Sequence, residues 1–242
     1  MPSRKPARLG RPPASSSVET RARILEVARE AFAASGFGVT TNKYLATKAG
    51  ITTGALYHYF DSKVAIYRAV YDEVQQFVYA HFTADLAGST TFIERFEAML
   101  ESAHRLNRED PSLARFLGAV RIDLARHDEL RAVMGSRSGQ GGAFFAAMVD
   151  AGVRSGEIRP EHRAMVVAFI QIATVGLVDA VSDDPRQHRI AVDAIRALIE
   201  GRLFEPPQRP RVSASAGTAK ASGTAKVRAS GNSARSAPRS RR

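Results

Sequence analysis

Residues 40–63 read TTNKYLATKAGITTGALYHYFDSK, and this stretch decides the fold of the chain. It predicts two short helices joined by a tight turn, followed by the start of a third helix. Thr41 suits the N-cap of the first helix, because its hydroxyl can accept a hydrogen bond from a free amide of the first turn. Gly50 suits the left-handed position that closes a helix. The candidate caps of the second and third helices are Thr52 or Thr53, and Asp61 or Ser62.

The second helix clusters three aromatic side chains with polar tips, Tyr57, His58 and Tyr59. An ordinary buried helix would not gather them. Two short helices around a tight turn are typical of a helix-turn-helix, whose second helix enters the major groove with its N-terminal end at the base edges. The stretch therefore predicts a DNA-binding motif.

Residues 50–63 closely resemble the signature of the TetR family of transcriptional regulators, an A-G-V-S-x-G-x-L-Y-x-H/Y-F-x-[SN]-K run. Asn42 departs from the family pattern, where a small apolar residue is usual, and so does Tyr44, where an acidic or polar one is common. The resemblance is specific over about residues 18–75 and only architectural over 89–204. It implies an all-α, TetR-like fold, with an N-terminal three-helix helix-turn-helix DNA-binding domain and a larger helical ligand-binding and dimerisation domain.

Several residues in or beside the motif are candidates for DNA contact. Lysines near helix ends can meet phosphates, and tyrosine hydroxyls can donate hydrogen bonds to phosphate oxygens. Threonines can meet base edges or thymine methyls, and a glycine lets the backbone approach DNA closely. Each candidate has an ordinary alternative, which is solvation, core packing or helix capping alone. The candidates are Lys43, Thr52, Thr53, Gly54, Tyr57, His58, Tyr59 and Lys63.

The positive charge of the chain is concentrated at its two ends. Residues 1–17 hold four basic residues and no acid, and residues 206–242 hold nine and no acid. The segment between them therefore carries −2 of the total charge of +11. Basic tails are commonly nucleic-acid-binding arms, although a solubilising extension explains the C-terminal one as well. The basic, proline-rich N-terminus has no apolar run like that of a signal peptide, so we expect a cytoplasmic, nucleoid-associated protein.

Composition shifts predict four regions. Residues 1–15 are a disordered basic arm, and residues 16–82 are the helix-turn-helix domain with its connecting helix. Residues 89–205 are the helical ligand-binding and dimerisation domain, and residues 206–242 are a disordered basic tail. In the larger domain we expect helices near 90–107, 111–126, 137–155, 160–181 and 186–204. Residues 126–129 lie between two of them and are most simply a solvated turn.

The segment 164–181, AMVVAFIQIATVGLVDAV, is apolar nearly all round. A membrane span needs about 20 such residues, and this run contains Gln171 and Asp179, so we expect no membrane span. A helix that is apolar on every side must bury both faces, one in its own domain and one against a partner. In the resembled family the last two helices pair with their symmetry mates in a four-helix bundle. The resemblance thus implies a homodimer through helices 160–181 and 186–204 on a palindromic DNA operator.

The resemblance also implies a pocket for a small-molecule effector inside the larger domain. In the resembled family, binding there changes the spacing of the two DNA-binding heads and lowers operator affinity. Apolar residues predominate on the helices that would line the pocket, which suits a largely apolar ligand, although they are equally suited to an ordinary core. The candidates are Phe92, Phe96, Leu117, Val120, Phe144, Met148 and Phe169. The effector itself is not specified by the sequence.

We predict no enzymatic activity, no cofactor and no metal site. The chain has no cysteine, and its histidines show no metal-ligand spacing. Residues 139–142, Gly-Gln-Gly-Gly, lack the lysine and the strand–loop–helix setting of a phosphate-binding loop. The expected function is a sequence-specific repressor. The alternative is a ligand-independent architectural protein that its basic tails hold on DNA.

Overall fold

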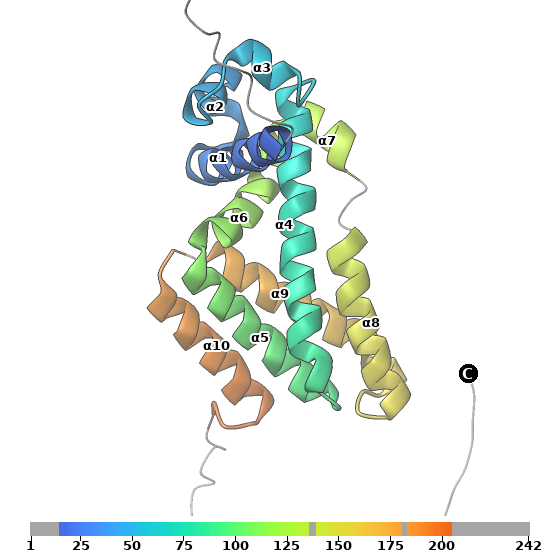
Figure 1. Cartoon of the computed structure of the whole chain (residues 1–242). Coiled ribbons are helices and arrows are strands. Elements are labelled where there is room, and N and C mark those ends of the chain that lie inside the picture. The colour runs from blue at the N-terminus through green and yellow to red at the C-terminus, as the bar shows by residue number, and fades with distance from the viewer. Residues whose placement is uncertain (1–14, 136–138, 181–182, 205–242) are drawn as a thin grey trace, which may run out of the picture. The chain divides into compact units, whose positions relative to one another are not determined.

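The computed structural model of the chain describes residues 15–135, 139–180 and 183–204. Most of these residues are helical and none of them forms a strand, which confirms the predicted all-α class. The elements are α1 (Ser15–Val39), α2 (Asn42–Lys48), α3 (Thr53–Tyr57), α4 (Lys63–Asp85), the short 3-10 helix η1 (Leu86–Gly88), α5 (Phe92–Glu109), α6 (Pro111–Arg126), α7 (Asp128–Met134), α8 (Gly139–Ser155), the short 3-10 helix η2 (Pro160–His162), α9 (Arg163–Asp179) and α10 (Pro185–Ile199) (Figure 1).

The first of two apolar core clusters holds the DNA-binding motif in place. It gathers buried side chains of α1, α2, α3 and the first half of α4, together with side chains of α6 and α7. Phe32 and Tyr67 lie at its centre with ring centroids 4.8 Å apart, and Phe116 of α6 lies 5.2 Å from Tyr67. The motif is thus packed on α6 as well as on its own helices.

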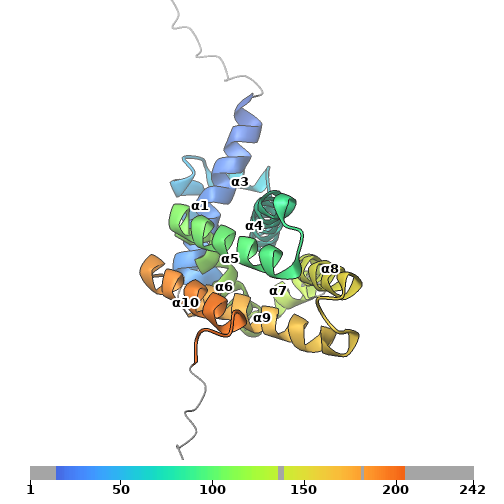
Figure 2. The ribbon, with the colours of Figure 1, turned by 90° about the horizontal axis from the view of Figure 1, so that it is seen from below.

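The second cluster lies around α5. It joins the last part of α4 to α5, α8, α9 and α10, with Phe96, Leu100 and Val149 fully buried. In the view from below, α5 lies between α4 and α10, and α8 and α9 approach each other at one side (Figure 2). The helix α4 contributes to both clusters, so it connects the motif to the larger group of helices.

Gly36 interrupts α1 near its end. Its φ of 73° and ψ of 173° leave the helical region, and one further turn reaches Val39. Only glycine adopts such a φ readily. A Cβ at this position would also lie 3.1 Å from Oδ1 of Asp123 on α6. The kink therefore depends on glycine for two reasons, its φ and the approach of α6.

The prediction of a solvated turn at residues 126–129 holds only in part, because residues 126, 128 and 129 are exposed, whereas 128 and 129 begin the helix α7. His127 is the N-cap of α7, and its ring packs 5.0 Å from that of Phe37. Leu130 and Met134, four residues apart on α7, are both buried in the first core cluster. A seven-residue helix has only these two inward-facing side chains, and two apolar residues are too few to reveal a helical repeat in the sequence.

The predicted domain boundary between residues 82 and 89 coincides with the end of α4 and with η1. Because α6 and α7 share a core with the motif, the larger domain is not packed separately from the head. The division at these residues remains a prediction. The predicted basic tail, and the basic arm up to residue 14, lie outside the described residues.

Candidate nucleic-acid interface and interior cavity

Local hydrogen bonds build the helix-turn-helix. The hydroxyl of Thr41 accepts from the amide of Tyr44 at 3.2 Å, and that of Thr52 accepts from the amide of Ala55 at 3.1 Å. Gly50 has a φ of 69°. Around it, the amide of Gly50 bonds to the Thr47 carbonyl and the amide of Ile51 to the Ala46 carbonyl. This is the Schellman arrangement that ends a helix, and it sets the angle between α2 and α3.

The start of α3 presents small and polar groups to the outside. Thr52 and Gly54 are exposed and Thr53 is half-buried. The Thr52 hydroxyl oxygen already accepts the capping hydrogen bond. Its methyl group and its hydroxyl proton are therefore what this exposed residue can offer to a partner. A Cβ on Gly54 would have a single neighbour within 4 Å, the Thr52 hydroxyl oxygen at 3.9 Å. The packing of the chain itself therefore does not require glycine at position 54.

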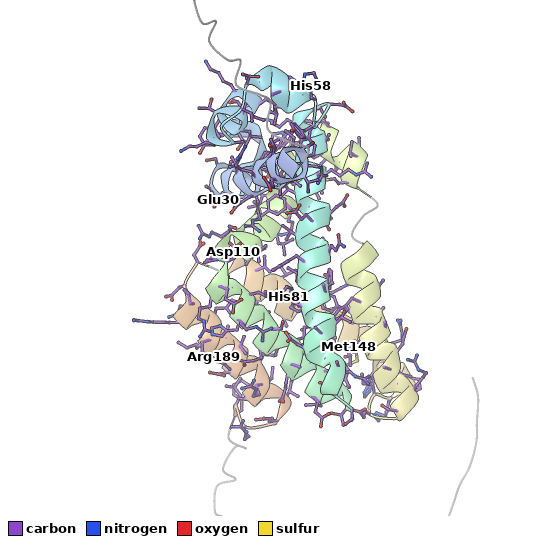
Figure 3. All side chains as sticks on the ribbon, in the orientation of Figure 1. Glu30, His58, His81, Asp110, Met148 and Arg189 are labelled. Carbon is purple, nitrogen blue, oxygen red and sulfur yellow. The ribbon has the colours of Figure 1, made fainter. Side chains whose placement is uncertain are left out.

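Tyr57 is held by one of the two residues that depart from the family pattern. The side-chain amide of Asn42 donates to the Tyr57 hydroxyl at 3.0 Å and links α2 to α3. The Tyr57 hydroxyl is the acceptor in this bond, so its own proton is not used in it. His58 caps the end of α3 and is exposed, and Figure 3 shows it at the outer end of the head. Tyr59 is half-buried against the first core cluster.

Lys63 lies differently from the other candidates. Its Nζ donates to the backbone carbonyls of Phe37 at 2.7 Å and Thr40 at 2.9 Å, and lies 4.0 Å from the centroid of the Phe37 ring. Burial lowers the pKa of Lys63, and the carboxylates of Glu129 and Asp123 partly oppose this. The ammonium therefore holds the end of α1 rather than projecting into solvent. Lys43, by contrast, is exposed.

A cavity of about 450 Å³ lies among α4, α5, α6 and α9 and is partly open to the outside, where the exposed side chains of Arg121 and Val175 line it. Of the residues proposed for a ligand, Leu117 and Val120 line it. Phe92, Phe96 and Met148 are buried in the second core cluster, and Phe169 packs against Phe96 with ring centroids 5.9 Å apart. Phe144 lines a separate open groove along α4.

Two polar residues of the cavity wall, Asn107 and His188, were not predicted from the sequence. Asn107 is 3% exposed, and neither its Nδ2 nor its Oδ1 has a hydrogen-bond partner in the described part of the chain. His188 of α10 is 2% exposed and also lines the cavity. A signal for Asn107 exists in the sequence, because it lies four residues after Ala103 on the apolar stripe of α5.

The charged and titratable groups of the cavity wall are neutral or paired. Burial and the neighbouring His104 lower the pKa of His188 to about 4, and the two rings approach with Nδ1 atoms 3.3 Å apart. Burial raises the pKa of Tyr79 to about 12, and that of Tyr71 is raised too. Arg121 pairs with Asp179, its Nε donating at 3.1 Å. Near pH 7 the wall therefore carries no unpaired charge.

The described residues contain no group of three or more side chains that could hold a metal ion. The His104–His188 pair is flanked by an ion-pair network in which Arg189 of α10 bonds to Glu101 of α5 at 2.8 Å. These contacts fasten α10 to α5. Figure 3 shows Arg189 at the outer side of this helix pair.

Comparison with known proteins agrees with this geometry. A family model described as "Bacterial regulatory proteins, tetR family" matches residues 24–70. The chain is 28% identical over 186 residues to the HTH-type transcriptional regulator UidR of Escherichia coli K12, covering 76% of this chain and 93% of UidR. It is 35% identical over 96 residues to the HTH-type transcriptional regulator TtgW of Pseudomonas putida, covering 40% of this chain and 72% of TtgW. The solved structure of GusR from Salmonella enterica superposes with a TM-score of 0.63 at 25% identity, over 77% of this chain and 96% of GusR.

Proposed function

Since the chain belongs to the TetR family of DNA-binding transcriptional regulators, we propose that it is a repressor that a small, largely apolar molecule releases from a palindromic operator. Members of the family are regulators and not enzymes. They bind operator DNA, dimerise and are soluble cytoplasmic proteins. Association of this chain with the nucleoid would follow from its DNA binding.

The proposed DNA contacts are those candidates that face outward. Thr52, Thr53 and Gly54 form the start of α3, where a recognition helix meets base edges. The open space beside Gly54 supports a close approach of DNA to the backbone. The hydroxyl of Tyr57 and the ammonium of Lys43 suit phosphate oxygens, and so does the imidazole of His58. Tyr59 and Lys63 would serve mainly by holding α3 and α4 in position.

The partner in the proposed homodimer covers an exposed apolar stripe. On α9 it consists of Met165, Ala168, Ile172 and Val175, spaced three or four residues apart, and Ile172 is 73% exposed. On α10, Ile190 and Leu198 are exposed apolar residues as well. By length and composition alone, Pro160–Asp179 could also span a membrane, and 11% of it is buried. The exposed apolar residues lie on one face, which fits a second copy of the helix pair.

Charge placed on this stripe tests the dimer. Ile172→Glu should dissociate it, because an unpaired carboxylate would be buried in the interface. Ile122→Glu on α6 is a matched control, since Ile122 is 45% exposed and does not belong to the stripe. Sedimentation should show monomers for the first variant and dimers for the second. If the Ile172→Glu variant is a folded, intact dimer, this interface is ruled out.

One observation supports release by a ligand, namely that α6 belongs to both the cavity and the head. Leu113, Leu117 and Val120 of α6 line the cavity. On the same helix, Asp123 accepts hydrogen bonds from the Phe37 amide and the Tyr67 hydroxyl, both at 3.0 Å. A molecule that displaces α6 from inside the cavity would therefore also move the end of α1 in the head.

Sequence preference separates the repressor from an architectural protein held by its basic tails. Selection of binding sites from random DNA, followed by fluorescence anisotropy at several salt concentrations, measures it. A repressor should prefer its best site by roughly a thousandfold or more, whereas charge-driven binding is indifferent to sequence and falls steeply with salt. Deleting residues 206–242 removes nine basic residues and should leave the preference unchanged. Loss of an existing preference on deletion would mean that the tail takes part in recognition, whereas the absence of any preference in the full-length protein would favour the architectural alternative.

A further inference from the structure

The cavity wall is mainly apolar, but it contains one buried polar side chain, Asn107, whose hydrogen-bonding groups have no partner in the described part of the protein. Asn107 lies on the last turns of α5, where Ala103 and Leu106 also line the cavity. Its amide is enclosed, and its donor and its acceptor are both without a partner in the described part of the protein. Leaving a buried donor or acceptor unsatisfied costs about 1–3 kcal/mol per group. Leucine at this position would avoid that cost in a purely structural core.

The wall excludes a charged ligand more firmly than an uncharged one. Arg121 and Asp179 neutralise each other, so the pair presents no net charge to a ligand ion. His188 is neutral near pH 7 and its Nδ1 already faces His104. An ion without a partner in such an environment would bear most of its desolvation cost. A cavity of about 450 Å³ has room for a molecule of the size of a medium-chain lipid derivative, with roughly a dozen non-hydrogen atoms.

We propose that the cavity binds an uncharged, mostly apolar molecule whose one polar group both donates and accepts a hydrogen bond, and that Asn107 recognises this group. A carboxamide and an alcohol have this chemistry. An ester or ketone can only accept, and a carboxylate carries charge. This proposal rests on the proposed function, because it specifies the effector that the repressor would sense.

Three probes with one common tail test the proposal on the full-length protein. Decanamide offers a neutral donor and acceptor, methyl decanoate offers acceptors only, and decanoate is an anion at pH 7.5. Isothermal titration calorimetry should show decanamide binding at least about tenfold more tightly than the other two, since one buried hydrogen bond is worth about that factor. Equal affinities, tightest binding of decanoate, or no binding of decanamide would each overturn the proposal.

Substitutions at Asn107 then assign the preference to this residue. Asn107→Leu should weaken decanamide binding about tenfold, leave methyl decanoate nearly unchanged, and keep or raise the stability of the free protein. Thr174→Val is the matched control. Thr174 also lines the cavity, but its hydroxyl already donates to the Ile170 carbonyl at 2.8 Å, so the preference should persist. If Asn107→Leu fails to fold, Asn107→Ala serves for the same comparison. If a variant without the amide at position 107 still prefers decanamide over methyl decanoate, Asn107 is not the recognising group.

Measuring DNA affinity on the same samples keeps the two proposals distinguishable. If decanamide binds with the expected preference and operator affinity does not change, the ligand class stands and release by a ligand is wrong. If the protein binds its operator specifically and no probe binds, the ligand class is wrong and the DNA-binding assignment stands.

Discussion

Lys63 provides the sharpest test of how the head is built, because two roles predict opposite results. Its match to the family signature suggested a phosphate contact. In the structure its ammonium donates to two backbone carbonyls, those of Phe37 and Thr40, at 2.7 and 2.9 Å. Both residues are at most 4% exposed, so the carbonyls have little access to water. Lys63→Met removes the charge and keeps an apolar stem beside the Phe37 ring.

The expected cost follows from these contacts. A hydrogen bond to a charged group contributes about 1.5–3 kcal/mol when well buried, and the half-exposed ammonium lowers that value. Together the two bonds and the contact with the ring should contribute about 2–3 kcal/mol. For a chain of this length that loss corresponds to a fall in Tm of about 5–10 °C. Thermal unfolding followed by circular dichroism, at fixed protein concentration, measures it.

Lys43→Met is the control, because Lys43 is exposed at the start of α2. Its substitution should change stability by less than about 0.5 kcal/mol. It should weaken binding to all DNA and lower the salt slope by about one. Lys63→Met should do the reverse, with a large loss of stability and little change in salt slope once the protein is folded. If Lys63→Met melts like the wild type and loses one unit of salt slope, the ammonium contacts phosphate and its structural role is refuted.

Three other substitutions have defined outcomes. Gly54→Ala should raise stability by about 0.5–1 kcal/mol, because alanine favours the helix and has room, and it should weaken operator binding in anisotropy titrations; tighter binding would contradict a close approach of DNA. Asp123→Ala leaves the Phe37 amide and the Tyr67 hydroxyl without an acceptor, and denaturant unfolding should show a loss of about 2–4 kcal/mol. His188 has a pKa of about 4 in the folded protein against 6.5 when unfolded, so stability should be full above pH 6.5 and fall by up to about 3 kcal/mol as the pH drops towards 4. His188→Gln should flatten this slope, and an unchanged slope would place the titration elsewhere.

The motif could be predicted from sequence because its determinants are local. Thr41 and Gly50 act through atoms three to five residues away, and the structure confirms both caps. Of the two candidates for the third cap, Asp61 and Ser62, the structure selects Ser62. The choice between Thr52 and Thr53 was open, because both precede the same helix. Only the course of the backbone decides that Thr52 is the cap.

The cavity could not be predicted in the same way. Apolar periodicity identifies which face of a helix is buried, but not whether the buried face meets another side chain or a void. Phe96 and Leu117 illustrate this limit, since both lie on inward faces, and only Leu117 lines the cavity. The partners of Lys63 were equally hidden. Its carbonyl acceptors lie 23 and 26 residues away in sequence, and their positions depend on the kink at Gly36.

The placement of Asp123 shows how a small displacement inside the cavity could reach the DNA-binding surface. The Asp123 carboxylate lies so close to Gly36 that a Cβ there would be 3.1 Å from its Oδ1. The amide of Phe37, the next residue after the kink, donates a hydrogen bond to the same carboxylate. Close-packed interiors transmit such displacements because few voids can absorb them. Val120 lines the cavity three residues before Asp123 on the same helix. A ligand that pushes on Val120 would therefore shift the hydrogen-bonded end of α1, and with it the position of α2 and α3 relative to the partner head. In Asp123→Asn this connection is weakened while the helix is kept, so ligand binding should persist and its effect on operator affinity should shrink.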